Sequence, residues 1–304
     1  MQKIGIIGGG ILGLSIAYNL ILTKKYNVHL YEKEDEIGKH QSGNNSGVLH
    51  CGLYYKPGSL KAKLAVEGIR EMISFCKKHN IDHDICGKLV VASNENEIKS
   101  LERLAKRGKL NGLNGLKFLN KNELKKREPN VYAIKSLLVP EEGIVDYKKV
   151  MEKMSEIIKQ EGGTIHLNSK IQKVTNQNNS TTLVSKNNEI SFDKIINCTG
   201  LFSDRTYSSI TNKKRPLRII PFRGEYMKIK NEYKDVVNHL IYPVPDSKYP
   251  FLGVHFTRMI NGDREVGPNA VFSFKREGYN KTDISIYDTL DSFFYKGFFN
   301  FLKN

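Results

Sequence analysis

The sequence has no tryptophan, only 4 cysteines among 304 residues, and no long uninterrupted apolar run. The cysteines show neither a C-x-x-C pair nor a zinc-ligand spacing, so we predict free thiols in a reducing compartment and no metal site. No segment approaches the roughly 18 apolar residues that a membrane-spanning helix needs. The first apolar segment begins almost at Met1, with no secretory signal pattern before it. Together these absences predict a cytoplasmic protein.

The sequence also has few acidic residues relative to basic ones. The chain has 48 Lys and Arg against 32 Asp and Glu, which gives a formal net charge of +16. A basic surface can attract nucleic acid, anionic lipid or acidic substrates. The excess is mostly lysine scattered through predicted loops and helices, without the clustered basic and aromatic residues of a nucleic-acid interface. We therefore expect no nucleic-acid partner and leave peripheral attachment to the inner face of the cell membrane open.

A glycine-rich turn near the N-terminus carries the strongest motif. The apolar segment 3–7 leads into G-x-G-x-x-G at Gly8, Gly10 and Gly13, and Glu32 ends the next apolar segment. In a dinucleotide site the three glycines permit the tight turn, the approach of a pyrophosphate and close helix–strand packing, respectively. The acidic residue accepts hydrogen bonds from ribose hydroxyls, and the helix N-terminus faces the phosphates. The sequence therefore predicts a dinucleotide site.

A second segment favours FAD over NAD. Residues 195–200 (IINCTG) form an apolar strand that ends in a small-residue turn containing Thr199 and Gly200. In flavoproteins with a glycine box, such a strand returns beside the first strand and contacts the dinucleotide. An NAD enzyme would continue the β-α-β alternation through a second half, and this chain does not.

The predicted fold class is α/β, with an FAD-binding Rossmann-like domain and an interleaved β-rich substrate domain built on an antiparallel sheet. We assign residues 1–86 and 140–215 to the FAD-binding domain, 87–139 and 216–290 to the substrate domain, and 291–304 to an apolar tail. Helices are expected at 60–79, 94–110, 120–127 and 146–161, and strands at 3–7, 27–31, 87–93, 164–167, 171–175, 181–185, 194–197, 217–220, 225–229, 241–244, 251–256 and 270–274. A hairpin turn is expected at 176–180, a capping pair at Asn120 and Glu123, and a long functional loop at 34–60.

Residues 40–64 (HQSGNNSGVLHCGLYYKPGSLKAKL) closely resemble a loop of the L-2-hydroxyglutarate oxidase/dehydrogenase family. This family belongs to the D-amino-acid-oxidase and glycerol-3-phosphate-dehydrogenase group of FAD enzymes. Segments 142–147, 196–205, 220–227, 243–258 and 267–279 resemble the same family. The resemblance implies FAD as cofactor and oxidation of L-2-hydroxyglutarate to 2-oxoglutarate, with hydride passing from C2 to flavin N5. Because members of this family are longer, we also expect a C-terminally truncated chain, whether a fragment, a frameshifted gene or a short protein with a partner.

The chemistry of this reaction selects candidate catalytic residues. Hydride removal from an α-hydroxy acid needs a base for the hydroxyl proton and cations for the carboxylates. His50 follows the small-residue loop and is the predicted base, since neutral imidazole suits proton abstraction near pH 7; His255 is a lesser candidate. Arg223 and Arg258 are predicted carboxylate clamps and Tyr226 a pocket hydroxyl. His255 and Arg258 have odd spacing, so they are expected on opposite faces of a strand.

The remaining predicted site residues are expected to bind the cofactor. They are Lys33, His40, Ser42, Asn44, Asn45, Ser46 and Gly47, together with Thr199 and Gly200. Two alternatives stay open: an FAD enzyme of the same group acting on another small anion, such as glycerol-3-phosphate or an amino acid, and an inactive remnant that serves as a binding protein. The electron acceptor, oxygen or quinone, and the oligomeric state are not fixed by the sequence.

Overall fold

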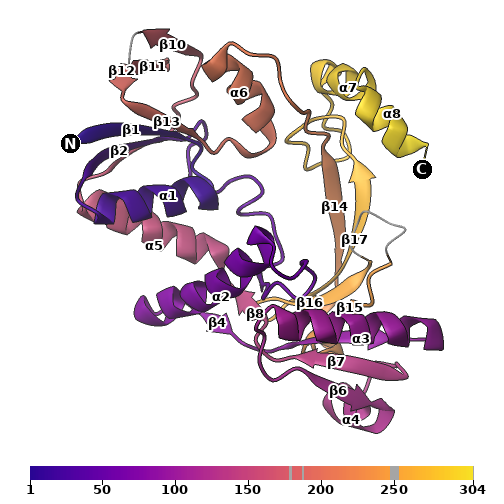
Figure 1. Ribbon diagram of the computed structural model, residues 1–304. Helices are drawn as coiled ribbons and strands as arrows, with labels where there is room; N and C mark the ends of the chain where they lie inside the picture. Colours follow the sequence, from indigo (N-terminus) through magenta and orange to yellow (C-terminus); the bar gives the residue numbers. More distant parts are fainter. Residues whose placement is uncertain (178–179, 187, 247–252, 304) are drawn as a thin grey trace. The chain divides into compact units, whose positions relative to one another are not determined.

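The computed structural model describes residues 1–177, 180–186, 188–246 and 253–303 (Figure 1). The chain divides into two compact units, each assembled from separate segments. Unit 1 comprises Met1–Asn45, Tyr147–Arg223 and Phe272–Asn304, and unit 2 comprises Ser46–Asp146 and Gly224–Val271. The predicted α/β class is confirmed, but these boundaries differ from the predicted ones. Residues 46–86 pack with unit 2, because short strands at Val48–Leu49 and His83–Asp84 both pair with one at Gly143–Val145.

Unit 1 is built on a parallel sheet with the strand order β13-β1-β2-β9. These strands are β1 (Gln2–Ile7), β2 (Tyr26–Tyr31), β9 (Thr164–His166) and β13 (Lys194–Asn197). Ile6 pairs with Leu30 on one side and Ile196 on the other, as expected for a central strand. Helices α1 (Ile11–Leu22) and α5 (Tyr147–Gln160) run side by side (Figure 1). The sequence therefore predicted correctly that the strand ending at Asn197 returns beside the first strand.

A small antiparallel sheet extends unit 1. Its strands are β10 (Lys173–Gln177), β11 (Ser180–Val184) and β12 (Glu189–Phe192). The sequence predicted two of them and missed β12, whose Phe192 is buried against Ile7, Tyr31 and Leu183. The predicted hairpin turn includes residues 178–179, which lie outside the described residues.

The C-terminal segment of unit 1 is folded. It follows η1 (Gly200–Phe202) and α6 (Ser203–Thr211) in the chain and contains α7 (Ile286–Phe293) and α8 (Lys296–Leu302). Phe298 is 3% exposed and stacks on Phe272, with ring centroids 5.1 Å apart. The segment predicted as an apolar tail thus contributes to the core, while Phe294 and Leu302 stay exposed.

Unit 2 contains a seven-stranded sheet with the order β14-β17-β16-β15-β5-β7-β6. Its strands are β5 (Lys88–Ala92), β6 (Lys117–Asn120), β7 (Lys135–Val139), β14 (Phe222–Lys228), β15 (Leu240–Pro243), β16 (His255–Arg258) and β17 (Arg264–Phe272). The predicted antiparallel sheet is mixed, because β15 pairs parallel to β5 after a long connection. The start of the strand predicted at 251–256 lies outside the described residues.

One predicted strand, at 217–220, does not form. The Ile219 N–H bonds the Asp204 carboxylate at 3.3 Å, and Arg218 Nη1 donates to the Asp291 carbonyl at 2.9 Å. The segment 217–220 is therefore held by the Asp204 side chain and by the C-terminal turn of α7. The sequence pattern had predicted that it pairs with another strand.

The remaining elements of unit 2 flank this sheet. A second sheet has the order β3-β8-β4, formed by β3 (Val48–Leu49), β8 (Gly143–Val145) and β4 (His83–Asp84). The helical elements are α2 (Leu60–Lys78), α3 (Glu95–Leu110), α4 (Lys121–Arg127) and η2 (Asn231–Val236). The predicted capping box at α4 is present: Asn120 Oδ1 accepts from the Glu123 N–H, and Glu123 Oε2 accepts from the Asn120 N–H, both at 3.0 Å. Among the described residues, no helix is long and apolar enough to cross a membrane.

A histidine pair between β2 and β9 predicts how stability depends on pH. His29 Nδ1 lies 3.2 Å from His166 Nε2, the rings stack, and burial lowers the pKa of both imidazoles. Below about pH 6.5 the unfolded chain binds protons that the native pair resists, so the free energy of unfolding should fall as the pH drops. We expect His166→Phe to flatten this dependence between about pH 7 and 5.5 in urea unfolding. An unchanged slope would contradict the assignment.

Candidate active site

The glycine turn after β1 is shaped by close backbone contacts. Gly8 has φ +111°, and a Cβ there would lie 2.3 Å from the Cys198 carbonyl oxygen at the end of β13. A Cβ on Gly13 would lie 1.9 Å from the Gly8 carbonyl oxygen. Any side chain at these positions would push α1 away from β1 and β13. The turn therefore brings the start of α1 to the carboxyl ends of parallel strands, where nucleotides bind in this kind of sheet.

Glu32 is fixed beside this turn. Its side chain is buried at the end of β2, where Oε2 accepts from the Gly9 N–H at 2.7 Å and Oε1 accepts from the Glu34 N–H at 3.0 Å. A carboxylate has about four acceptor positions, so two backbone hydrogen bonds orient it and still leave acceptors for ribose hydroxyls. The position of Glu32 fits the predicted role of accepting hydrogen bonds from ribose hydroxyls.

The loop after β2 folds against the start of α1. Ser42 Oγ accepts from the Ile11 N–H at 3.0 Å, and a Cβ on Gly10 would lie 2.9 Å from the same oxygen. Asn44 Nδ2 donates to the Lys39 and His40 carbonyls, each at 2.8 Å, while Asn45 Nδ2 donates to the Ser42 carbonyl at 2.7 Å. The two asparagines, predicted to bind the cofactor, thus have local bonds that hold the loop in shape.

Lys33 and His40 belong to an ion-pair cluster in unit 1. The Lys33 ammonium pairs with Glu277 and lies 3.2 Å from Glu34. His40 Nε2 lies 2.9 Å from Glu34 Oε1 and 3.3 Å from Glu277 Oε1, and Nδ1 lies 3.3 Å from the Tyr279 hydroxyl. The two carboxylates and the imidazole are spaced closely enough to bind a metal ion. The Lys33 ammonium already supplies a positive charge to these two carboxylates, in place of a metal ion. The cluster therefore connects the loop after β2 to the segment after β17.

The turn after β13 completes this end of unit 1. Thr199 Oγ1 donates to Asn197 Oδ1 at 2.7 Å, and Gly200 has φ +51°. Gly8 bonds back to Tyr31 through its N–H at 2.8 Å, so the ends of β1, β2 and β13 are joined around the glycine turn. The predicted residues Gly8, Gly10, Gly13, Glu32, Ser42, Thr199 and Gly200 therefore gather at one edge of one sheet, and they fit an FAD pyrophosphate and ribose.

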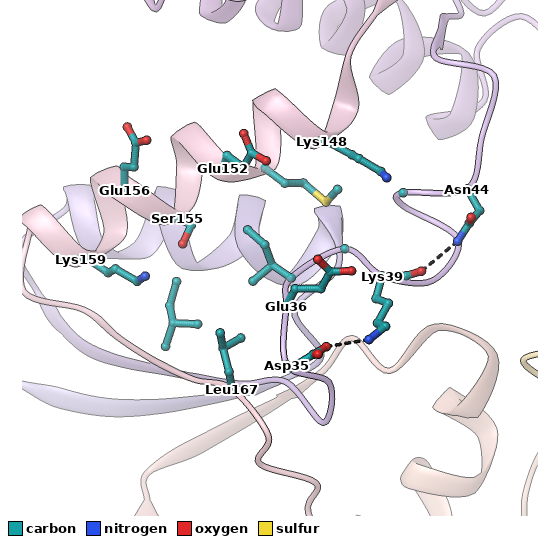
Figure 2. A pocket seen from close by; sticks show the side chains of 15 residues that line it. Asp35, Glu36, Lys39, Asn44, Lys148, Glu152, Ser155, Glu156, Lys159 and Leu167 are labelled. Carbon is teal, nitrogen blue, oxygen red and sulfur yellow. Dashed lines mark hydrogen bonds and ion pairs between the residues drawn. The ribbon is translucent and has the colours of Figure 1, made fainter.

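A separate cavity of about 390 Å³ lies between the 35–44 loop and α5 (Figure 2). Its lining carries both signs of charge, including Glu36, Lys39, Lys148 and Glu152. Of the predicted cofactor residues only Asn44 lines it, and none of the predicted catalytic residues does. This cavity is therefore separate from the cofactor site predicted at the glycine turn.

Unit 2 holds a buried ion pair next to the predicted base. Lys88 Nζ on β5 lies 2.6 Å from Glu142 Oε2, and the side chains are 0% and 1% exposed. Burial raises the pKa of the Glu142 carboxyl, but the Lys88 ammonium and the contact with His50 together outweigh it, so the pKa is held well below its usual range. Burial lowers the pKa of Lys88, but the charge and close contact of Glu142, with smaller contributions from Tyr54 and Cys51, together outweigh it and the net shift is upward. Both groups are therefore charged near neutral pH.

His50 lies at the open side of this pair. Its Nδ1 is 3.4 Å from Glu142 Oε2, and its side chain is 43% exposed. The ring meets Tyr242 edge-on, with centroids 6.2 Å apart. An accessible imidazole beside a buried carboxylate is an arrangement suited to a general base.

His255 is placed differently. It is 2% exposed, stacks on Tyr242 with centroids 4.0 Å apart, and bonds the Gly253 carbonyl through Nδ1 at 2.9 Å. Burial lowers the pKa of His255, which keeps it neutral. Tyr226 meets His255 edge-on at 6.2 Å and shares a hydrogen bond with Ser46, while burial raises the pKa of the phenol. His255 and Tyr226 thus gather near His50, and Ser46 belongs to this group in unit 2.

The predicted arginines have protein partners. Arg258 Nη2 lies 2.8 Å from Asp84 Oδ2, and Arg223 Nη1 donates to the Asn280 carbonyl at 3.0 Å. Arg223 falls in unit 1 and Arg258 in unit 2. Along β16, burial alternates so that His255 is buried and Arg258 half-buried, which agrees with the predicted opposite faces. Gly47 has φ +70° and pairs with β8 through its carbonyl, so it shapes the chain between Ser46 and β3.

The sequence interpretation missed Lys88 and gave Glu142 no role. One signal was available, because Lys88 interrupts the apolar segment 87–93, and a charge in a buried strand needs a partner. Nothing local indicated that this partner would be Glu142. The rings of Tyr54 and Tyr242 lie 4.5 and 4.9 Å from Lys88 Nζ, measured to the ring centroids.

The glycine turn gives a direct prediction. Gly13→Ala should weaken FAD binding strongly and lower stability, because its Cβ would collide with the Gly8 carbonyl. Gly68→Ala is the matched control, since a Cβ at this α2 position meets nothing within 4 Å and alanine favours helix by about 1 kcal/mol. Bound flavin per protein and thermal unfolding measure the two effects. Equal flavin content in both variants would contradict the role of Gly13.

Comparisons with known proteins support FAD as the cofactor. Residues 3–298 match the family model described as FAD dependent oxidoreductase. The chain is 46% identical to L-2-hydroxyglutarate dehydrogenase of Indibacter alkaliphilus over 96% of this chain and 74% of that protein. It is 42% identical to L-2-hydroxyglutarate dehydrogenase of Escherichia coli (strain K12) over 100% of this chain and 72% of that protein.

Solved structures share the fold. L-alpha-glycerophosphate oxidase from Mycoplasma pneumoniae with FAD bound has a TM-score of 0.82 and 25% identity, covering 93% of this chain and 76% of that chain. Glycine oxidase from Geobacillus kaustophilus has a TM-score of 0.74 and 15% identity, covering 90% of this chain and 74% of that chain. The second likeness concerns the fold alone.

Proposed function

Since the chain belongs to the FAD-dependent oxidoreductase family, among the L-2-hydroxyglutarate dehydrogenases, we propose that it oxidises L-2-hydroxyglutarate to 2-oxoglutarate with FAD as its cofactor. The observation that carries this proposal is 46% identity to such a dehydrogenase over 96% of the chain. The geometry of the glycine turn supports the cofactor, and the accessible His50 beside a buried carboxylate supports the oxidation of a hydroxyl group.

The roles of the residues follow from their contacts. Gly8, Gly13 and the start of α1 would hold the pyrophosphate of FAD, and Glu32 would accept from its ribose. FAD, when bound, supplies the acceptor for the two electrons that leave C2 of the substrate. His50 takes the proton of the C2 hydroxyl, which allows the C2–O double bond to form. Arg223 and Arg258 remain predicted carboxylate ligands, and each would have to exchange its protein partner for substrate.

A substrate panel tests the proposal. We expect turnover with L-2-hydroxyglutarate and formation of 2-oxoglutarate, with D-2-hydroxyglutarate, glycerol 3-phosphate and glycine far slower. A second candidate function, oxidation of a small phosphate ester, is favoured by the likeness to L-alpha-glycerophosphate oxidase. Faster turnover of glycerol 3-phosphate than of L-2-hydroxyglutarate would establish that second function and overturn the first.

The electron acceptor in this proposal is oxygen or a membrane quinone. The net charge of +16 supports attachment to an anionic membrane surface, where quinones are available. Measurement of hydrogen peroxide per 2-oxoglutarate separates the two, since an oxidase forms one peroxide per product and a quinone-linked enzyme forms little. Cosedimentation with anionic vesicles, compared with neutral vesicles, tests the attachment.

A further inference from the structure

We propose that Lys88 and Glu142 are positioning residues that orient His50 as the catalytic base through a fixed Lys88–Glu142–His50 chain of contacts. This inference rests on the proposed function of His50. The three side chains come from distant parts of the sequence: His50 follows β3, Lys88 lies on β5, and Glu142 precedes β8. All three belong to unit 2, so the chain of contacts lies within one compact unit.

Glu142 is fixed by contacts on both of its oxygens. Oε1 accepts from the Cys51 N–H at 3.3 Å and from the Cys51 Sγ at 3.1 Å. Oε2 lies 2.6 Å from Lys88 Nζ and 3.4 Å from His50 Nδ1. Because one oxygen is anchored to the backbone, the other has a defined direction toward the imidazole. The carboxylate therefore presents one acceptor to His50 in one orientation.

Lys88 keeps this carboxylate charged. A buried carboxylate without a partner would take up a proton and lose its value as an acceptor. The Lys88 ammonium lies over the rings of Tyr54 and Tyr242, whose faces favour a cation. Buried charges of opposite sign are kept only when they remain paired, since removing one leaves the other uncompensated. Lys88 is thus the group that holds Glu142 in its acceptor form.

The consequence for His50 is a choice of tautomer. A neutral imidazole carries one N–H, and a carboxylate facing Nδ1 favours the hydrogen there. Nε2 then carries the lone pair and accepts the proton of the C2 hydroxyl. The O–H and C2–H bonds break, the carbonyl forms, the hydride leaves to the acceptor of the proposed function, and the proton stays on Nε2. Glu142 stabilises the resulting imidazolium, and the exposed side of His50 returns the proton to solvent.

Other titratable groups face this chain from the neighbouring elements. Cys51 and Tyr54 follow His50, Tyr242 comes from β15, and His255 and Tyr226 come from β16 and β14. Burial raises the pKa of the Cys51 thiol and the Tyr242 phenol and lowers the pKa of His255, so these three stay neutral near pH 7. Of the groups named around His50, Lys88 and Glu142 therefore supply the fixed charges on its Nδ1 side.

The first test reads the tautomer directly and needs no substrate. NMR of histidine-labelled protein, with the His50 signals identified by their loss in His50→Asn, should show the Nδ1–H form in the wild type. In Glu142→Gln we expect this preference to be lost. An Nε2–H form in the wild type, or an unchanged Nδ1–H form in Glu142→Gln, would overturn the inference whatever the substrate is.

The second test measures the rate at which L-2-hydroxyglutarate reduces the bound flavin without oxygen. Glu142→Gln should slow this step about 100-fold while substrate binding changes little, because the base is misoriented and the pocket is intact. Lys88→Met with Glu142→Gln removes both buried charges together, so it protects the fold and should be equally slow. Lys88→Arg should keep more activity than Lys88→Met.

Glu141→Gln is the matched control, since Glu141 is the neighbouring carboxylate but contacts Arg70 and Asn114. It should react at the wild-type rate. Reduction of the Glu142→Gln and double variants within about threefold of wild type, while His50→Asn is slow, would overturn the positioning role. A wild-type protein that binds FAD and ignores L-2-hydroxyglutarate would instead refute the proposed function, and the NMR result would still decide the role of Glu142.

Discussion

Replacing His50 by asparagine should slow flavin reduction by L-2-hydroxyglutarate roughly 100- to 10,000-fold, the usual contribution of a general base. Asparagine fills a similar space and can face Glu142, but it cannot take the proton of the C2 hydroxyl. Substrate binding should change by only a few fold, because the removed interaction acts mainly in the transition state. Stopped-flow reduction without oxygen, over a range of substrate concentrations, separates the rate from the binding constant.

His83→Gln is a suitable control for this experiment. His83 also belongs to unit 2, but its Nδ1 contacts the Ile81 carbonyl at 2.8 Å and takes no part in the group around Glu142. We expect a rate close to that of the wild type. If His50→Asn reduced its flavin as quickly as His83→Gln, His50 would not be the base, and His255 would become the leading candidate.

Replacing Arg276 by methionine should lower the free energy of unfolding by about 3–5 kcal/mol, the cost of removing the main partner of a buried charge. Arg276 Nη2 bonds Asp204 at 2.9 Å and Asp291 at 3.1 Å, and its Nη1 bonds the Leu201 carbonyl. Arg276 and Asp204 are only 2% and 4% exposed. Removal of the guanidinium would leave the Asp204 carboxylate with the Arg215 guanidinium at 3.3 Å and the Ile219 N–H as weaker partners. Because Arg276 also bonds the Leu201 carbonyl, next to Thr199 and Gly200, flavin content should fall as well.

Urea unfolding at neutral pH measures this loss, and a second variant controls it. Asp204→Asn with Arg276→Met removes both charges, so it should be less destabilised than Arg276→Met alone. Lys117→Met breaks the exposed pair with Glu123 and should change stability far less. If Arg276→Met unfolded at the same urea concentration as Lys117→Met, the network would not stabilise unit 1.

The same network sets a limit at acid pH. Burial raises the pKa of Asp204, but the bonds from Arg276 outweigh it and the net shift is downward. A carboxyl with a depressed folded pKa contributes stability above its unfolded pKa of about 3.9 and loses it as the pH falls through the folded value. The contribution of Asp204 to the free energy of unfolding should therefore persist at mildly acid pH. In the same pH range, the pair His29 and His166 already lowers the free energy of unfolding.

The parts of the site that depend on neighbouring residues could be predicted from sequence. The glycine turn, Glu32 and the strand before Thr199 follow from local spacing, and the structure joins them at one sheet edge. The capping box at Asn120 is equally local. These features are set by backbone sterics and hydrogen bonds that any chain with this spacing must satisfy.

The parts of the site and the fold that depend on contacts between distant residues could not be predicted from the sequence. Glu142 is 91 residues from Cys51, its hydrogen-bond donor, and no periodic pattern connects them. The parallel pairing of β15 with β5 and the burial of Phe298 likewise depend on which surfaces meet after folding. For Asn44 and Asn45 the residue type suggested ligand binding; the structure adds that the Nδ2 group of each donates to a backbone carbonyl of the loop.

The most direct test of the central claim is the visible spectrum of the purified protein before and after L-2-hydroxyglutarate is added without oxygen. We predict a bound flavin spectrum that bleaches with the L enantiomer and stays unchanged with the D enantiomer. Appearance of 2-oxoglutarate in proportion to the bleached flavin would complete the result. A flavin that dithionite bleaches but L-2-hydroxyglutarate does not would contradict the proposed reaction, and a colourless protein that takes up no added FAD would contradict the cofactor site itself.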